Sequence, residues 1–295
     1  MKYFEKHPMI MVALAVLGCA LAGVFVKTSE APSVVTAAVR LLWTVLLLSP
    51  VTLGSRSFRK ELVQIDRKSL LLGCLSGLFL AAHFTIWFES LNYTSVATST
   101  TICCTEVVWV TIAFCIFLKG TISKMAVAAI AVTLFGNVMI AWVDFASGSG
   151  LYGDLLALIA AVLLAAYTVL GKILREKLST TVYTYICYSA CAAALLVCCL
   201  TQGHGLFEYG MSPVVSGLML ALFSTIMGHS IFSWCLKFLS PSFVSASKLC
   251  IPVVSAVLAL IVFGEVPTAL QMLGCVIILG GMLWYYSIES REKRR

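Results

Sequence analysis

Two residues of opposite charge, Glu106 and Lys248, lie deep inside long apolar runs of the sequence. At a helical rise of about 1.5 Å per residue, Glu106 is about 18 Å from one end of its run, and Lys248 is about 10 Å from the opposite end of its own. In hydrocarbon about 30 Å thick, both would lie at similar depth near the middle. A charge there costs about 2.5–3.5 kcal/mol, so we expect both side chains to face a cavity and each other. Glu106 could serve as a proton acceptor, as a counter-charge for a cationic substrate, or as the structural partner of Lys248.

Histidine and aromatic residues occur at helical spacing around these charges. His83 and Trp87 are four residues apart, and Glu106 and Trp109 are three apart, so each pair shares a helix face. Both pairs predict a polar pocket with aromatic walls. The other residues expected to line it are Tyr167, His229 and Trp234. The alternative for each aromatic residue is that it only fills an interface between helices.

A third intramembrane charge, Arg40, lies about 11 Å below the surface of its run. We expect it to tie helices together or to cap carbonyl groups rather than to bind substrate. Glu89, Glu265 and Lys237 lie near the ends of runs, where their side chains can reach water, and we assign them no chemistry.

The elements that must position these residues are membrane-spanning helices. The chain of 295 residues is 61% apolar and only 11% charged, whereas about a quarter of the residues of a soluble domain are charged. The apolar runs are about as long as a membrane span requires and lack the alternation of a barrel strand, so we predict an all-α integral membrane protein. The ten predicted spans are 8–26, 33–54, 69–91, 94–118, 123–143, 151–171, 180–200, 213–235, 241–263 and 267–287.

The basic residues predict the orientation. If the N-terminus is inside, seventeen of the twenty Lys and Arg residues fall on the cytoplasmic side, including five in residues 55–68, and only Lys27 falls outside. This asymmetry follows the positive-inside rule and indicates that both termini are cytoplasmic. We expect a multi-pass protein of the plasma membrane, that is, of a bacterial cytoplasmic membrane. Its basic tail is expected to contact anionic headgroups rather than nucleic acid.

An internal repeat divides the chain into residues 1–145 and 146–295. An offset of 145 residues carries the first five spans onto the last five without a gap. Because five is odd, the second half must enter the membrane in the opposite sense, and such inverted repeats are typical of alternating access around a midplane site. The identical pairs at this offset are Lys27 with Lys172, Ile86 with Ile231, Leu91 with Leu236, Ser95 with Ser240, and Gly136 with Gly281.

Four short segments give the chain a family resemblance. They are residues 37–40 (AAVR), 90–97 (SLNYTSVA), 236–241 (LKFLSP) and 263–265 (FGE), the last followed by Gln271 and Gly274. With these, the chain resembles the drug/metabolite transporter superfamily of the EamA type over nearly its whole length. The resemblance implies two five-helix halves with a central cavity lined by spans 1, 3, 4, 6, 8 and 9. The sequence departs from the family at two places. The ninth span keeps the family's proline as Pro252, whereas the fourth span has Glu106-Val107 at the equivalent place. Gly264-Glu265 of the second half corresponds to Lys119-Gly120 in the first half.

The favoured function is secondary active transport. We expect an exporter or exchanger of a small polar metabolite such as an amino acid, nucleoside or organic cation, with protons as a candidate coupling ion. An uptake or exchange carrier for a substrate like S-adenosylmethionine is the alternative, and a receptor and an intramembrane enzyme are the rival classes. No phosphate-binding glycine loop or metal-ligand cluster is evident, so no cofactor or metal is expected, and no enzyme activity. The protein is expected to be a monomer or a weak homodimer.

Two further features have structural interpretations. The twelve cysteines all fall in predicted helices, where we interpret them as small packing residues rather than disulfide partners. The start of the chain, with basic residues before an apolar run ending at Cys19, resembles a signal peptide. The internal repeat predicts that this segment is retained as the first span.

Overall fold

The computed structural model describes residues 5, 7–94, 96–145, 150–264 and 266–292. Within these residues every regular element is a helix, and ten stretches are long and apolar enough to cross a membrane. The all-α prediction and the number of spans are therefore confirmed. Ser95, Glu265 and five of the basic residues counted above lie outside the described residues; the five are Lys2, Lys6, Lys293, Arg294 and Arg295.

The first half holds five spans, two of them divided into shorter helices. Span 1 comprises α2 (Pro8–Ala20) and α3 (Ala22–Lys27), span 2 is α4 (Ser33–Gly54), span 3 is α6 (Arg67–Ser90), span 4 comprises α7 (Val96–Cys103) and α8 (Glu106–Phe117), and span 5 is α9 (Lys124–Phe145).

The second half repeats this order. Span 6 is α10 (Leu151–Arg175), span 7 is α11 (Thr180–Thr201), span 8 comprises α12 (Ser212–Met219), η1 (Leu220–Ser230) and α13 (Ile231–Cys235), span 9 comprises α14 (Pro241–Ser247), η2 (Lys248–Cys250) and α15 (Ile251–Phe263), and span 10 is α16 (Ala269–Glu292).

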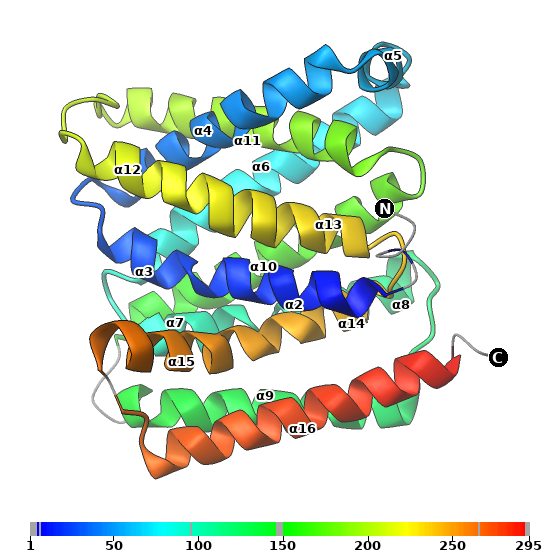
Figure 1. Cartoon of the computed structure of the whole chain (residues 1–295), viewed down its shortest axis with the longest axis vertical. Coiled ribbons are helices and arrows are strands. Elements are labelled where there is room, and N and C mark those ends of the chain that lie inside the picture. Colours follow the sequence, from blue (N-terminus) through cyan, green and yellow to red (C-terminus); the bar gives the residue numbers. More distant parts are fainter. Residues whose placement is uncertain (1–4, 6, 95, 146–149, 265, 293–295) are drawn as a thin grey trace.

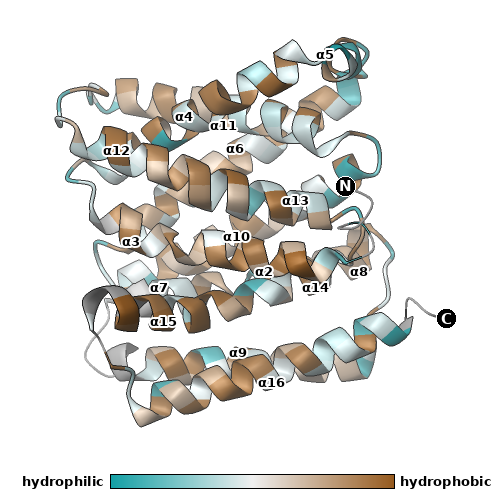
Figure 2. Cartoon of the chain, viewed as in Figure 1, coloured by the Kyte–Doolittle hydropathy of each residue, from teal (hydrophilic) through white to brown (hydrophobic). Residues whose placement is uncertain are grey.

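The spans lie side by side, and the chain reverses direction after each one (Figure 1). The N- and C-terminal ends of the described chain lie at the same end of the bundle, together with α5 (Arg56–Val63). Figure 2 shows hydrophilic residues at the ends of the helices and on α5, and apolar residues along their lengths. We refer to the end that holds the termini as the basic end, because the Lys and Arg residues between the spans gather there.

The segment at residues 55–68, which connects the second and third predicted spans, contains the short helix α5. None of its residues is buried, and Val63 is 84% exposed. Its acidic residue Glu61 accepts a hydrogen bond from the backbone N of Ser179 at 2.6 Å, which joins α5 to the start of α11. Helix α5 therefore lies across the basic end as a surface helix that links the two halves.

Side-chain caps begin three of the helices at the basic end. Asp66 accepts from the backbone N of Ser69 at 2.9 Å, and Ser179 and Ser240 cap α11 and α14 in the same way. The Ser69 hydroxyl also donates to Asp66 at 2.6 Å. These hydrogen bonds, the one from the Ser69 side chain first, lower the pKa of the Asp66 carboxyl below its ordinary value, because they favour its ionised form. The caps satisfy backbone N–H groups that have no partner within the helix.

Spans 4 and 9 are interrupted at equivalent places. A turn at Cys104 and Thr105 separates α7 from α8, and at the offset of 145 residues these positions align with Leu249 and Cys250 of η2. In span 9 the cause is Pro252, which has no N–H to donate to the carbonyl of Lys248 four residues earlier. In span 4 the Thr105 hydroxyl donates to the Ile102 carbonyl at 2.6 Å, and the backbone turns through i to i−3 hydrogen bonds.

Contacts between the halves are exchanged by the repeat offset. A Cβ atom on Gly136 of α9 would lie 3.0 Å from the backbone N of Ile278 in α16. The related pair is Gly281 and Thr133, and there the corresponding distance is 3.1 Å. Such reciprocal contacts are expected at a two-fold axis. They accord with the inverted arrangement of the two repeats.

The packed apolar core extends across the boundary between the two halves. One cluster joins α4 and α6 to α10 and α11, and a second joins α2, α8 and α9 to α13, α14 and α16. Each cluster contains residues from both repeats. Residues 1–145 and 146–295 are therefore interleaved within one bundle and not two separately packed bodies.

Candidate functional site

An ion pair between the two interrupted helices forms the centre of the candidate site. The Nζ atom of Lys248 lies 2.9 Å from Oε1 and 2.8 Å from Oε2 of Glu106. The residues are only 7% and 1% exposed. Glu106 begins α8 and Lys248 begins η2, so both charges stand at the breaks of their spans. The depth estimate from the sequence and the observed contact therefore agree.

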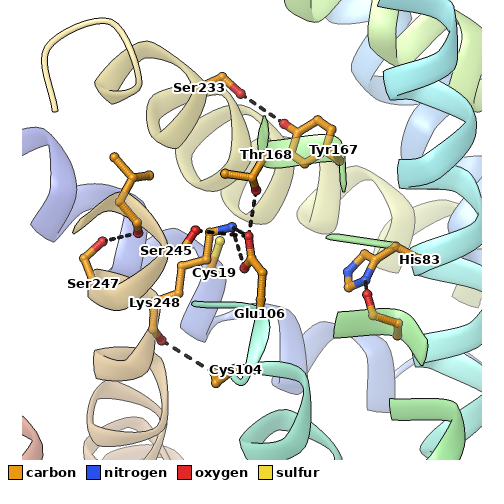
Figure 3. A network of polar contacts seen from close by, with 12 residues as sticks. Cys19, His83, Cys104, Glu106, Tyr167, Thr168, Ser233, Ser245, Ser247 and Lys248 are labelled. Atoms are coloured by element: carbon orange, nitrogen blue, oxygen red, sulfur yellow. Dashed lines mark hydrogen bonds and ion pairs between the residues drawn. The ribbon is translucent and has the colours of Figure 1, made fainter. Parts of the chain in front are cut away.

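Hydroxyl groups complete the surroundings of the carboxylate. Thr168 of α10 donates to Oε1 of Glu106 at 2.6 Å, and Ser245 of α14 donates to the same atom at 3.3 Å. Figure 3 shows both side chains pointing at the carboxylate alongside Lys248. The ammonium group also lies 5.5 Å from the ring centre of Phe232 in α13. The site thus draws residues from spans 4, 6, 8 and 9, which belong to both halves.

The interrupted backbone leaves carbonyl groups that side chains satisfy. The Asn137 amide of α9 donates to the Leu249 carbonyl at 3.1 Å, and the Cys104 thiol contacts the Lys248 carbonyl at 3.8 Å. The Asn137 amide also donates to Thr133 within its own helix, at 3.1 Å. The Oδ1 atom of Asn137 is buried and accepts no hydrogen bond from any residue that the structure describes. Asn137 therefore holds span 5 against the break in span 9.

Sequence reasoning did not select Thr168, Ser245 or Asn137. Serine and threonine are frequent in membrane helices, where they usually bond to a carbonyl of their own helix. Neither spacing nor composition separates the few that reach another span. The available signal was positional: Thr168 follows the selected Tyr167, and Ser245 precedes Lys248 by three residues.

His83, Trp87, Tyr167 and His229 form an aromatic group beside the ion pair. His83 donates from Nδ1 to the Ala160 carbonyl at 2.9 Å, and its ring lies nearly parallel to Trp87 at 6.3 Å between centroids. His229 lies 6.1 Å from Tyr167, and the hydroxyl groups of Tyr167 and Ser233 are 3.0 Å apart. Figure 3 places His83 and Tyr167 on one side of Glu106. These residues join spans 3, 6 and 8.

Two features of the aromatic group bear on function and symmetry. The indole Nε1 of Trp87 is buried and finds no hydrogen-bond partner within the described part of the chain, so one donor is left unsatisfied there. Phe84 and His229 occupy equivalent positions at the 145-residue offset and contact each other edge to face at 5.4 Å. The pseudo-two-fold relation therefore passes close to this group.

Arg40 links span 2 to span 8. Its Nε donates to the Thr225 hydroxyl at 2.7 Å, and its Nη2 donates to the Ser224 hydroxyl at 3.0 Å. Its guanidinium also lies 4.2 Å from the centre of the Phe84 ring. Both hydroxyl groups belong to the π-helical segment η1, where wide turns are frequent at functional sites. The contacts are those of a residue that ties two helices together.

Among the described residues, no hydrogen bond or ring contact joins Trp109 or Trp234 to the ion pair, although both were expected in the wall of its pocket. Trp109 is 36% exposed. The buried stripe of α8 runs through Glu106, Val107 and Val110, so it lies on the other side of Glu106 from Trp109. Trp234 packs on Phe238 at 4.5 Å, next to the turn that leads into span 9. The shared face of Glu106 and Trp109 was therefore the wrong basis for a common pocket.

The groups at this site suit the binding of a charged ligand, which would replace one partner of the ion pair. A carboxylate, an ammonium group and several hydroxyl groups are buried together, and no group of three metal-ligating residues is found in the described chain. A ligand with a charged group can replace either partner of the ion pair. A proton can do the same at the carboxylate.

Comparisons with known proteins identify the family. Residues 7–142 and 151–287 each match the EamA-like transporter family, so the second match begins 144 residues after the first. A Clostridium kluyveri protein described as an uncharacterized transporter is 28% identical over 209 residues, which cover 68% of this chain and 67% of that protein. A Bacillus subtilis protein with a similar description is 25% identical over 274 residues, 88% of this chain and 83% of that protein.

A solved structure shares the fold. A protein crystal structure matches with a TM-score of 0.79 and 17% identity, and covers 97% of this chain and 98% of its own. With both halves matched and the fold shared, the chain is a multi-pass membrane transporter and belongs to the EamA-like transporter family.

Proposed function

We propose that this transporter carries a small zwitterionic metabolite, with amino acids as the first candidates, by alternating access around Glu106 and Lys248. The observation that carries the proposal is the ion pair itself, which is buried at the breaks of two spans. Burying two charges is expensive, and a hydrophobic pair of similar volume would often be at least as stable. A carboxylate and an ammonium group kept at this depth are therefore candidates for substrate recognition.

The pair of opposite charges favours a zwitterion over the other substrate classes. The ammonium group of an amino acid can take the place of Lys248 at Glu106, while its carboxylate pairs with Lys248. A purely cationic substrate would leave the Lys248 ammonium group without a counter-ion, and a neutral nucleoside would satisfy neither charge. The unsatisfied indole N–H of Trp87 adds a donor for a polar group nearby.

Protons and substrate compete for the same carboxylate in this proposal. A proton on Glu106 removes its charge and weakens its hold on Lys248, much as a bound ammonium group would. Competition of this kind couples proton entry to substrate exit, and so favours a proton-driven exporter or exchanger. Thr168 and Ser245 remain as hydrogen-bond donors to the carboxylate while Lys248 moves.

The inverted repeats supply the motion. Spans 4 and 9 meet at the ion pair, and each is broken at the same point of its repeat, so either half can rock about the break. In this proposal the basic end faces the cytoplasm, in keeping with the positive-inside rule, and the membrane is the cytoplasmic membrane of a bacterial cell. A receptor or an intramembrane enzyme would have no need of a site shared by two inverted halves.

Transport by the purified protein in liposomes tests the function. Vesicles loaded with one unlabelled amino acid at a time should accumulate the same labelled amino acid by exchange. The matched amine without a carboxylate, and the matched acid without an amine, should exchange much more slowly. Exchange of the amine alone at the rate of the amino acid would contradict the zwitterion proposal. Exchange of none of the metabolites would contradict transport through this site.

A further inference from the structure

A polar pocket lies at the basic end of the bundle, away from the central ion pair. It encloses about 210 Å³ between the turn that follows α8 and the ends of α14 and α16. This is smaller than the roughly 300–1,000 Å³ of drug-sized sites, and suits a group of a few heavy atoms. The lining residues are Phe114, Thr121, Ile122, Ala126, Ser240, Ser242, Tyr285 and Glu289.

A buried carboxylate gives this pocket its charge. Glu289 is only 9% exposed and accepts hydrogen bonds from the backbone N and the hydroxyl of Ser240, at 3.2 and 3.1 Å. None of the described residues forms an ion pair with it; the described ion pairs are Lys248 with Glu106 and Lys172 with Glu176. Buried charges are normally paired, and the described part of the chain supplies no counter-ion for this carboxylate.

An unsatisfied hydroxyl lies in the same wall. Ser242 is 1% exposed, and its Oγ atom has no hydrogen-bond partner among the described residues. Buried polar side chains without partners are rare in folded proteins. Ser242 follows Ser240, which holds Glu289, by only two residues along the chain. Two hydrogen-bond acceptors, one of them charged, therefore line one pocket.

Aromatic rings from two spans also line the pocket. Phe114 comes from α8 and Tyr285 from α16. Rings of this kind attract cations placed over their faces. An anion would meet a carboxylate here, and an apolar group would offer no counter-charge to Glu289 and no hydrogen bond to Ser242.

We propose that this pocket binds a primary ammonium group, with Glu289 and Ser242 as its acceptors. Three N–H donors distinguish a primary ammonium from a quaternary one, which could offer no hydrogen bond to Ser242. The group can come from an ethanolamine lipid headgroup or from a free small amine, because the pocket lies at the end of the bundle where both are present. The site is separate from Glu106 and Lys248, and it does not depend on the substrate proposed for them.

Thermal unfolding of the full-length purified protein tests the site, with ethanolamine as the probe. The midpoint temperature should rise with ethanolamine and saturate, since a ligand of the folded state stabilises it by mass action. Ethylene glycol, which lacks the charge, and choline, which lacks the N–H donors, should give at most a weak rise. In Glu289→Gln the half-saturating concentration should increase at least about tenfold. The amide oxygen in this variant can still accept from the backbone N of Ser240, and the cap of α14, in which Phe243 N donates to the Ser240 hydroxyl, does not involve Glu289.

Two further variants provide a control and a second test of the site. Glu89→Gln removes a carboxylate from the opposite end of the bundle and should behave as the unaltered protein. Ser242→Ala should weaken the ethanolamine response severalfold without lowering the midpoint in its absence, and it decides the matter if Glu289→Gln fails to fold. An unchanged response in Glu289→Gln or in Ser242→Ala would overturn the proposal.

Native mass spectrometry separates the two sources of the ammonium group. Protein released from vesicles of phosphatidylethanolamine should retain that lipid, and Glu289→Gln should retain less, if the headgroup is the ligand. Phosphatidylcholine should be retained equally by both proteins. A response to free ethanolamine without selective lipid retention assigns the pocket to soluble amines. The absence of both a thermal response and selective lipid retention would refute the ammonium site.

Discussion

The ion pair between Glu106 and Lys248 has no counterpart across the repeat. At an offset of 145 residues, Glu106 aligns with Ile251 and Lys248 aligns with Cys103. The backbone breaks are nevertheless shared by both spans. The two halves thus have a common framework of interrupted helices, on which one half carries the carboxylate and the other the ammonium group. The asymmetry concentrates the proposed chemistry at a single pair.

Replacement of Glu106 by glutamine should separate proton coupling from exchange. The amide of Glu106→Gln would keep an oxygen to accept from Lys248 and Thr168, but it cannot take up a proton in the working pH range. We expect this variant to lose accumulation driven by a pH gradient in proteoliposomes while substrate exchange continues at a reduced rate. Glu89→Gln serves as the control. A pH-driven accumulation that survives Glu106→Gln would remove this carboxylate from the coupling mechanism.

The same pair offers a test of its structural role. Glu106→Leu leaves the Lys248 ammonium group buried without its counter-ion and should lower the free energy of unfolding by about 3–5 kcal/mol. Adding Lys248→Met should restore most of that loss, because no uncompensated charge remains. Unfolding in mixed detergent micelles would measure both effects. Additive losses in the double variant would mean that the two side chains do not stabilise each other.

The spans were predictable from the sequence, because lipid requires about 20 apolar residues for each crossing. The predicted run 33–54 and helix α4 (Ser33–Gly54) agree at both ends. Span 6 continues beyond its predicted end at residue 171 to Arg175. Its polar last turn is held by other residues, as Arg175 donates to the carbonyl groups of Ser233 and Leu178. Hydropathy ends a span at its first polar turn and does not register such contacts.

The site was only partly predictable. Charge at depth identified Glu106 and Lys248, because the membrane penalises isolated charges and brings opposite ones together. The position of Trp109 could not be predicted, because a helix face shared with Glu106 does not show which side of Glu106 is buried. The break in span 4 depends on side-chain hydrogen bonds such as that of Thr105, which hydropathy does not register.

Asn137 should stabilise the break in span 9, although its position in the sequence gives no indication of this role. Met282, its counterpart at the repeat offset, cannot donate a hydrogen bond. Asn137→Met removes the donor to the Leu249 carbonyl, and should lower the free energy of unfolding by about 0.5–2 kcal/mol. Asn92→Met, at an exposed position, is the control and should have little effect. Equal losses in the two variants would show that the Leu249 contact is unimportant.

The orientation can be tested by cysteine labelling. In a protein freed of its own cysteines, Lys60→Cys lies on α5 at the basic end, and Phe207→Cys lies at the opposite end, where Phe207 is 83% exposed. A maleimide that cannot cross membranes should label intact cells at residue 207 and leave residue 60 unlabelled until the cells are opened. The reverse pattern would invert the assignment of the basic end to the cytoplasm.

Neighbouring glycines in α16 provide a matched test of the contact between spans 5 and 10. A Cβ atom on Gly281 would meet the Thr133 hydroxyl and lie 3.1 Å from its backbone N, whereas a Cβ on Gly280 would meet no atom within 4 Å. Alanine favours a helix over glycine by up to about 1 kcal/mol, so Gly280→Ala should be neutral or stabilising. Gly281→Ala should destabilise by about 1–3 kcal/mol, because backbone atoms of α9 must move.

The repeat extends this test to the first half of the chain. A Cβ atom on Gly136, the counterpart of Gly281, would lie 2.8 Å from the Gly274 carbonyl oxygen and 3.0 Å from the Ile278 N. Gly136→Ala should therefore lower the free energy of unfolding by a similar amount to Gly281→Ala. Because both substitutions force apart the same two helices, their combined effect should be smaller than the sum of the two losses. Equal effects of Gly280→Ala and Gly281→Ala would mean that helix propensity, and not close approach, governs these positions.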